Sequence, residues 1–124
     1  MGLTPTQRTL KALRDKGMIA GVVERFNRFG GSHGVRQDLF NIIDIIALDK
    51  ERGVVGVQST GTSFAQHHKK LTEERKQECI DWLETPGTAL ELWGWRKVKR
   101  GNRQVMVPRL RIYTLEDFTD GAED

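Results

Sequence analysis

The stretch from residue 41 to residue 66, NIIDIIALDKERGVVGVQSTGTSFAQ, decides the fold of this chain. Two apolar runs rich in β-branched residues flank the turn sequence DKERG, which predicts two neighbouring strands. The first run begins at Asp38 and is almost continuously apolar, as is typical of a central strand with both faces covered. After the second run, Ser63 and Gln66 form an S-x-x-Q capping box, which predicts the start of a helix.

Outward from this stretch, the sequence pattern predicts further elements on both sides. Thr4, Pro5 and Gly17 mark the beginning and the end of a first helix. The other predicted elements are a strand over 18–27, a glycine-rich connection over 28–37, a helix over 64–84 with a second start at Thr72, and a closing hairpin of strands 88–98 and 106–118 around the tip KRGNRQ. The order α-β-β-β-α-β-β predicts an α/β fold with a central mixed β-sheet flanked by helices.

The size and composition are those of a single globular domain. We place this domain at residues 1–118 of the 124 and treat residues 119–124 as an acidic C-terminal tail. No apolar segment approaches the roughly 20 residues that span a bilayer, and the N-terminus lacks the layout of a secretory signal. The single cysteine, Cys79, suits a reducing compartment. We therefore expect a cytoplasmic protein that does not bind membranes.

The net charge of +3 is distributed unevenly along the chain. Between residues 96 and 111 there are seven basic residues and no acidic one, whereas residues 116–124 carry five acids. The basic residues are Arg96, Lys97, Lys99, Arg100, Arg103, Arg109 and Arg111. A basic block beside a strand indicates a polyanionic partner such as nucleic acid, and we expect the first five of these residues to bind it. The alternative interpretation is a solvated hairpin tip.

Asp44 is a carboxylate set into an apolar run, where an isolated charge is costly unless it has a partner, a metal or a proton. In an extended strand Asp44 shares a face with Ile42 and Ile46, while Gln58 and Thr60 share a face on the next strand. If the two strands are neighbours, a carboxylate, an amide and a hydroxyl converge at one end of the sheet. Such oxygen ligands favour a hard cation such as Mg²⁺. A lone carboxylate at a strand edge is the alternative.

This layout resembles the PD-(D/E)xK nuclease superfamily. The run IIDIIAL resembles the family's aspartate strand, and GVQST resembles the next strand, with Gln58 in place of the acid and Thr60 in place of the lysine. The segments SFAQHHKKL, WLETPG and LELWGWRK extend the similarity over most of the chain, and the branch it resembles best is the Holliday-junction-resolvase-like proteins of phages and archaea. The resemblance implies a restriction-endonuclease-like fold, metal-dependent hydrolysis of DNA with Mg²⁺ or Mn²⁺, and a homodimer, because cutting both strands of a junction takes two active sites.

The sequence departs from the family at the two uncharged motif positions. The family's lysine orients or activates the attacking water, which Thr60 cannot do, and Gln58 offers a metal only a neutral carbonyl oxygen beside Asp44. Lys69 and Lys70, on the following helix, are candidates to replace the missing lysine. The alternative for both lysines is a solvated helix face.

Two further acids precede this motif. Glu24 is a second-rank candidate for the catalytic site, with a surface ion pair as the alternative. Asp38 lies six residues before Asp44, which is roughly 20 Å in a straight strand, so the two carboxylates should not share one ion. A turn at Asn41 would change this, but the simpler expectation for Asp38 is a contact at the start of the strand.

The histidines and tryptophans give weaker indications of function than the carboxylates. His67 and His68 are adjacent on a helix and point about 100° apart, so together they do not chelate one metal. Trp93 and Trp95 alternate onto one strand face, where they should pack against a helix or a partner, with base stacking as the minor alternative.

Three functions follow from these residues. The first is a metal-dependent DNA endonuclease, with branched DNA among its expected substrates. The second is a catalytically inactive nucleic-acid-binding protein on the same fold. The third is an assembly role in which the tryptophan-bearing strand contributes to a dimer interface.

Overall fold

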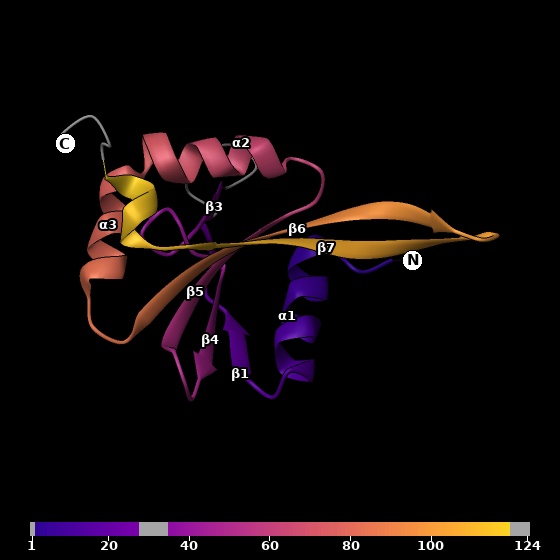
Figure 1. The fold of residues 1–124 in the computed structure, drawn as a ribbon, viewed down its shortest axis with the longest axis horizontal. Helices are drawn as coiled ribbons and strands as arrows, with labels where there is room; N and C mark the ends of the chain where they lie inside the picture. Colours follow the sequence, from indigo (N-terminus) through magenta and orange to yellow (C-terminus); the bar gives the residue numbers. More distant parts are fainter. Residues whose placement is uncertain (1, 28–34, 120–124) are drawn as a thin grey trace.

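The computed structural model describes residues 2–27 and 35–119, which form an α/β structure around a five-stranded mixed sheet (Figure 1). The main sheet has the strand order β1-β4-β5-β6-β7, and β2 and β3 form a separate two-stranded sheet. The strands are β1 (Ile19–Val22), β2 (Arg25–Asn27), β3 (Val35–Gln37), β4 (Ile45–Asp49), β5 (Gly53–Thr60), β6 (Thr88–Arg100) and β7 (Arg103–Tyr113). The helices are α1 (Pro5–Asp15), α2 (Phe64–Lys69) and α3 (Lys76–Glu84), with a π-helical turn η1 (Lys70–Glu74) between α2 and α3 and a 3₁₀ turn η2 (Leu115–Phe118) after β7. The predicted class and flanking helices are confirmed.

The strand directions explain where the helices lie. β4 pairs antiparallel with β1 and β5, and β6 pairs antiparallel with β7, but β5 and β6 are parallel. A parallel pair needs a long crossover connection, and the segment from α2 through α3 provides it. Figure 1 shows this segment on the opposite side of the sheet from α1.

Because side chains alternate along each strand, the sheet has two separate apolar cores. The core under α1 contains Leu13, Ala20, Ile45, Ala47, Val55, Val57, Trp93 and Trp95. The core under α2 and α3 contains Ile42, Ile43, Phe64, Leu71, Cys79, Leu90, Leu92, Tyr113 and Phe118. Odd-numbered residues of β5 and β6 therefore face α1, and even-numbered residues face α2 and α3.

The boundaries of two predicted strands were wrong. The predicted strand over 18–27 is divided, because β1 belongs to the main sheet and β2 to the small one. The predicted strand from residue 38 begins only at Ile45, since Phe40 and Asn41 have positive φ values of 55° and 65° and reverse the chain. Asp44 consequently lies just before β4 rather than within a continuous strand.

The predicted helix starts at Pro5 and Phe64 are in place, but only the first has the predicted cap. The predicted second start at Thr72 was wrong, because Thr72 lies inside η1 and α3 begins at Lys76. Thr4 and Gln7 form a complete capping box at α1. Ser63 precedes α2 without any side-chain capping hydrogen bond, so the predicted Ser63 capping box was wrong. Residues 28–34 of the predicted glycine-rich connection and residues 120–124 of the predicted acidic tail lie outside the described residues. The remaining residues of that connection were wrongly predicted as a loop, because Val35–Gln37 form β3 by pairing with β2.

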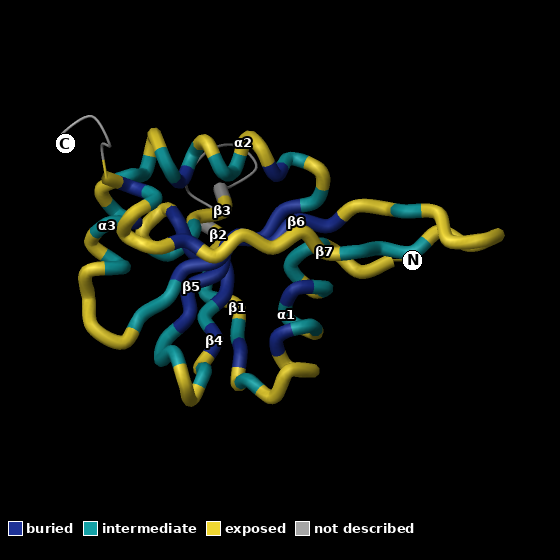
Figure 2. The backbone as a smooth tube through the Cα atoms, viewed as in Figure 1, coloured by how far each residue is buried: buried dark blue, intermediate teal, exposed yellow. Residues whose placement is uncertain are grey.

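The predicted closing hairpin is present and extends away from the body. β6 and β7 stay paired from Leu90 opposite Tyr113 to Arg100 opposite Arg103. Figure 2 shows β6 buried where it crosses the body, whereas β7, the edge strand, is mostly exposed there, and both strands are mostly exposed toward the tip. We call residues 96–107 of this hairpin the arm.

Candidate metal centre

Three carboxylates meet beside the end of β5. Glu24 lies between β1 and β2, Asp38 follows β3, and Asp44 precedes β4. One ligand oxygen from each of the three lies within 4.8 Å of the other two. This carboxylate cluster is a group that could hold a metal ion.

A tight turn brings Asp38 to Asp44. Leu39 and Ile43 exchange two backbone hydrogen bonds, with N···O distances of 2.8 Å for the Leu39 amide and 3.0 Å for the Ile43 amide. Phe40 and Asn41 occupy left-handed backbone conformations inside this turn, and asparagine tolerates that conformation better than most residues. The expectation that Asp38 lies too far away to share an ion with Asp44 was therefore wrong, because it assumed a straight strand.

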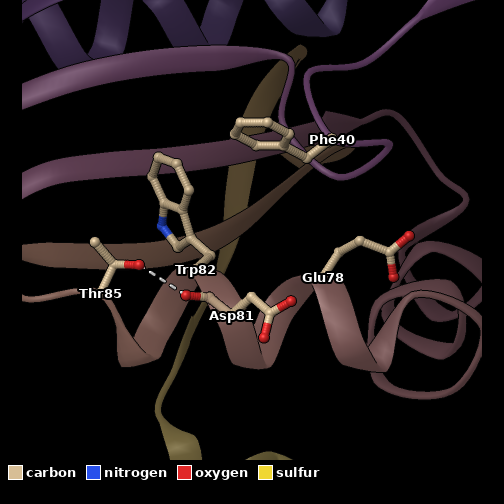
Figure 3. A pocket seen from close by; sticks show the side chains of 5 residues that line it. All are labelled: Phe40, Glu78, Asp81, Trp82 and Thr85. Atoms are coloured by element: carbon tan, nitrogen blue, oxygen red, sulfur yellow. Dashed lines mark hydrogen bonds between the residues drawn. The ribbon is translucent and has the colours of Figure 1, made fainter.

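The Phe40 side chain ties this turn to α3. Its ring lies 6.4 Å from the Trp82 ring, centroid to centroid, and the two rings line a surface pocket of about 300 Å³ (Figure 3). The acidic residues that line this pocket have partners, because Glu78 pairs with Arg75 and Asp81 accepts a hydrogen bond from the Gln77 side chain. We therefore interpret the contact between Phe40 and Trp82, whose rings line this pocket, as structural support for the turn.

Asp44 is the most enclosed member of the cluster, with 6% of its surface exposed. Its Oδ2 accepts a hydrogen bond from the backbone N–H of Ser59 at 2.9 Å, and the Ser59 hydroxyl lies 3.4 Å away. Burial raises the pKa of Asp44 to about 8, and the neighbouring Asp38 and Glu24 carboxylates act in the same direction, against the Ser59 amide. Without a cation, Asp44 thus keeps a proton at neutral pH.

Asp38, in contrast to Asp44, is held in its ionised form. Its Oδ2 accepts a hydrogen bond from Gln58 Nε2 at 2.9 Å and lies 3.4 Å from the Lys70 ammonium. Burial acts to raise the pKa of Asp38, but hydrogen bonds from Asp44 and Gln58 and the charge of Lys70 together lower it. Asp38 and Asp44 therefore form an unequal pair, one ionised and one protonated.

Gln58 connects the carboxylates to the crossover segment. Its fully buried amide nitrogen donates to Asp38 and to the Ile42 carbonyl, while its Oε1 accepts from Lys70 at 3.1 Å and faces His67 Nδ1 at 3.2 Å. The carbonyl oxygen that we expected to face a metal therefore faces Lys70 and His67. Burial and the Lys70 charge lower the pKa of His67.

Of the other predicted catalytic residues Lys69, Lys70 and Thr60, only Lys70 reaches the carboxylate cluster. Lys70, the first residue of η1, reaches the cluster, whereas Lys69 is exposed. Adjacent helical residues point about 100° apart, which explains this difference. Thr60 is buried at the end of β5, and no hydrogen bond joins its side chain to the carboxylate cluster in the described ranges 2–27 and 35–119.

Two arginines from the small sheet lie beside the cluster, and the sequence interpretation did not identify them. Arg36 of β3 approaches Glu24 at 3.5 Å, and Arg25 of β2 lines two surface cavities of about 280 Å³ each. One cavity includes Asp38 and the other includes Glu24. The R-x-D spacing of Arg36 and Asp38 was the available signal, but only the pairing of β2 with β3 places Arg36 near Glu24.

The donor set suits a hard cation. Carboxylate oxygens are the ligands that Mg²⁺, Mn²⁺ and Ca²⁺ prefer, whereas the sole cysteine is buried elsewhere, in the core under α2 and α3. His68 is also turned away from the cluster, because its Nδ1 lies 2.7 Å from the Tyr113 hydroxyl. The chemistry of the cluster is therefore that of an oxygen-ligated divalent cation rather than of zinc.

The predicted polyanion-binding residues are exposed to solvent, whereas the two tryptophans are buried. Arg96, Lys97, Lys99, Arg100 and Arg103 are all exposed on the arm. Trp93 and Trp95 stack on each other at 6.1 Å, and Trp95 Nε1 donates to Thr9 of α1 at 2.8 Å. Both tryptophans are buried under α1, so the exposed aromatic stripe on which base stacking and a dimer interface depended is not present.

Comparison of this chain with family models, with curated proteins and with solved structures finds no match. Within the described residues, no helix combines the length and apolar character needed to cross a membrane.

Proposed function

We propose that this protein is a metal-dependent DNA endonuclease that hydrolyses phosphodiester bonds at the carboxylate cluster. The observation that carries the proposal is the placement of three carboxylates within 4.8 Å of one another, with the Lys70 ammonium 3.4 Å from one of them. Oxygen ligands beside a fixed cation are what metal-assisted phosphoryl chemistry requires. The resemblance to the PD-(D/E)xK superfamily supports the same reaction.

The residues of the cluster fit Mg²⁺ or Mn²⁺ by their donor chemistry. When bound, such a cation polarises the scissile phosphate and lowers the pKa of a water molecule beside it. Glu24, Asp38 and Asp44 would hold the cation, and Asp44 would release its proton to do so. The Ser59 amide, which donates a hydrogen bond to Asp44 Oδ2, would keep the carboxylate oriented when the cation binds.

Lys70 takes the role that Thr60 cannot fill. Its ammonium is positioned by Gln58 and Asp38 and can stabilise negative charge that develops on the phosphate. Gln58 is therefore a positioning residue in this proposal rather than a metal ligand. Arg25 and Arg36 line the cavities beside the acids and would contact neighbouring phosphates.

The test is cleavage of labelled duplex, single-stranded and four-way-junction DNA with Mg²⁺ or Mn²⁺. We expect cutting by the wild type, loss of cutting in Asp44→Asn, and a loss of about 10²-fold or more in Lys70→Met. Lys69→Met is the matched control, because it removes the same charge one residue away, and it should retain activity. Cutting that survives Asp44→Asn would overturn the proposal. Sedimentation with junction DNA would test the homodimer that we expect for a two-strand cut.

One observation favours a second function, that of a nucleic-acid-binding protein without catalysis. The positions matched to the family's acid and lysine carry the uncharged Gln58 and Thr60, and Gln58 and Asp38 already hold Lys70 in place. In that case wild type and Asp44→Asn would bind DNA equally, and neither would cut it with any divalent cation.

A further inference from the structure

The arm has two chemically different faces. In a β-ribbon, alternate residues and their cross-strand partners share a face. Arg96, Arg100 and their partners Val107 and Arg103 lie on one face, while Lys97, Lys99 and their partners Met106 and Gln104 lie on the other. The arginines and lysines of the arm are therefore sorted onto opposite faces.

The arginine face continues along the hairpin into the body. Arg109 lies opposite Gly94 and Arg111 opposite Leu92, so both belong to the same set of positions as Arg96 and Arg100. The Arg109 guanidinium lies 4.1 Å from the centre of the Phe64 ring of α2, which confirms its side of the sheet. Gln58 pairs with Leu92 in register and therefore faces the same side. All five arginines from residue 96 to residue 111 thus share the face that carries Gln58 and Lys70.

Three of these arginines are available for a ligand. Arg109 covers Phe64, and Arg111 bonds Asp117 at 2.8 Å. By contrast, no hydrogen bond or ion pair within residues 2–27 and 35–119 engages Arg96, Arg100 or Arg103, and all three are exposed. From Glu91 to Glu116 the sequence contains no intervening acid that could neutralise them.

The chemistry of this face indicates a double-stranded ligand. Arginine forks match phosphate oxygens, whereas proteins that hold single strands use exposed aromatic rings for stacking. Trp93, Trp95 and Tyr113, the aromatic residues of β6 and β7, are buried. The groove that admits a two-stranded β-ribbon is the major groove of B-form DNA, about 12 Å wide, while the corresponding groove of duplex RNA is too narrow.

We propose that the arginine face of the arm, through Arg96, Arg100 and Arg103, binds B-form duplex DNA and holds it toward the carboxylate cluster. This inference rests on the proposed function, because it names the form of the substrate that the cluster would cut. Arg96 and Arg100 are four residues apart on one strand, roughly 13 Å, so they contact different phosphates. In this proposal the lysine face turns away from the bound duplex, so Lys97 and Lys99 no longer belong to the five residues that the sequence predicted to bind a polyanion.

Two variants with the same change in charge test the proposal. Arg96→Gln/Arg100→Gln alters the arginine face, and Lys97→Gln/Lys99→Gln alters the lysine face. Binding would be followed by fluorescence anisotropy in EDTA, so that hydrolysis does not interfere, with a labelled duplex of about two helical turns (~20 bp). We expect the arginine variant to bind about tenfold or more weakly and its log K against log[salt] slope to become shallower by roughly 2. We expect the lysine variant to bind within about threefold of the wild type.

Several outcomes would overturn the proposal. Equal losses in the two variants would mean that the total charge of the arm matters and its faces do not. No loss in either would place the binding surface elsewhere, and equal affinity for single-stranded DNA or for an RNA duplex of the same sequence would show that the ligand form is wrong. Melting curves of both variants should match the wild type, because the substituted side chains are exposed.

The two proposals fail separately. If wild type cuts duplex DNA with Mn²⁺ while the arginine variant binds normally in EDTA, the arm proposal fails and the nuclease stands. If the arginine variant loses binding while Asp44→Asn still cuts, the arm proposal stands and the catalytic assignment fails.

Discussion

Asp44 combines burial with two acidic neighbours, so its proton is coupled to folding. The folded protein holds this proton up to about pH 8, whereas the unfolded chain releases it near the ordinary value of 3.8. Between these values the folded state binds more protons than the unfolded state. Stability therefore decreases as pH rises through this range, and the contribution of Asp44 is lost above about pH 8.

We predict that, in EDTA, the melting temperature of the wild type decreases from about pH 7 to about pH 8.5, and that Asp44→Asn largely removes this decrease. The window avoids His67, whose lowered pKa makes stability rise with pH below its ordinary value of 6.5. Thermal melts monitored by circular dichroism would measure both proteins. An equal decrease in the variant would assign the proton to another group.

Asn41 contributes through its backbone. Its φ of 65° is a conformation that a β-branched residue adopts at a cost of about 1–2 kcal/mol and glycine adopts freely. We predict that Asn41→Val destabilises the protein by about this amount and weakens Mn²⁺ binding, because the turn no longer holds Asp38 beside Asp44. Asn41→Gly is the control and should retain Mn²⁺ affinity. Unimpaired Mn²⁺ binding in Asn41→Val would contradict the role of the turn.

At the scale of elements, the turn between β4 and β5 packs closely against the loop that enters β6. Gly53 begins β5 with a φ of 93°, and a Cβ at this position would collide with the Gly87 carbonyl group, which accepts a hydrogen bond from Val54 at 2.8 Å. Gly101, at the tip of the arm, has a φ of 63°, but a Cβ there would meet no neighbour within 4 Å. Substitution of Gly101 should therefore cost only backbone strain, whereas substitution of Gly53 should cost backbone strain and a steric clash.

We predict that Gly101→Ala lowers the free energy of unfolding by about 1 kcal/mol, the cost of the left-handed conformation. Gly53→Ala should cost at least about 1–3 kcal/mol more, because the turn between β4 and β5 must move away from the loop that enters β6. Urea denaturation of both variants would measure the difference. Equal losses would show that the contact with Gly87 contributes nothing.

The π-helical turn η1 is the element that brings the crossover segment to the cluster. It begins at Lys70, whose side chain reaches Asp38, while the next residue, Leu71, is buried in the core under α2 and α3. Such turns are often found at functional sites. The packing of Leu71 therefore positions Lys70 and leaves Lys69 exposed.

At the scale of the whole molecule, the carboxylate cluster joins the two sheets. Glu24 lies at the entrance to the small sheet, and Asp44 at the entrance to β4 of the main sheet. A bound cation would add to the backbone hydrogen bonds that Val23 and Glu24 already donate to the Asp44 carbonyl, and by linkage it would stabilise the native state.

We predict that Mn²⁺ at about ten times its dissociation constant stabilises the wild type by about 1.4 kcal/mol, which raises the melting temperature by roughly 5 °C. The same addition should leave Asp44→Asn nearly unchanged, because the variant lacks one ligand charge. Differential scanning fluorimetry with Mn²⁺ and Mg²⁺ titrations would measure both. A shift of equal size in the variant would mean that the cation binds elsewhere.

Much of the fold follows from local patterns in the sequence. The cap at Thr4, the alternation in β5 and β6 and the polar tip of the hairpin each depend on residues close together in the chain, so the class and the approximate element order were predictable. The division of the first predicted strand into β1 and β2, and the strand β3, were not. The sorting of arginines and lysines along β6 follows from the same alternation, although the register with β7 was needed to add Arg103.

The composition of the carboxylate cluster was decided by tertiary structure. The sequence identified Asp44 and offered Glu24 and Lys70 only as candidates beside others, and it set Asp38 aside. A straight strand would separate the backbones of Asp38 and Asp44 by roughly 20 Å. A two-residue reversal at Phe40 and Asn41, stabilised by the contact of Phe40 with Trp82 of α3, instead brings carboxylate oxygens of the two residues within 4.8 Å of each other. Local propensity cannot report such a contact, because it depends on Trp82, which lies more than 40 residues after Phe40 in the chain.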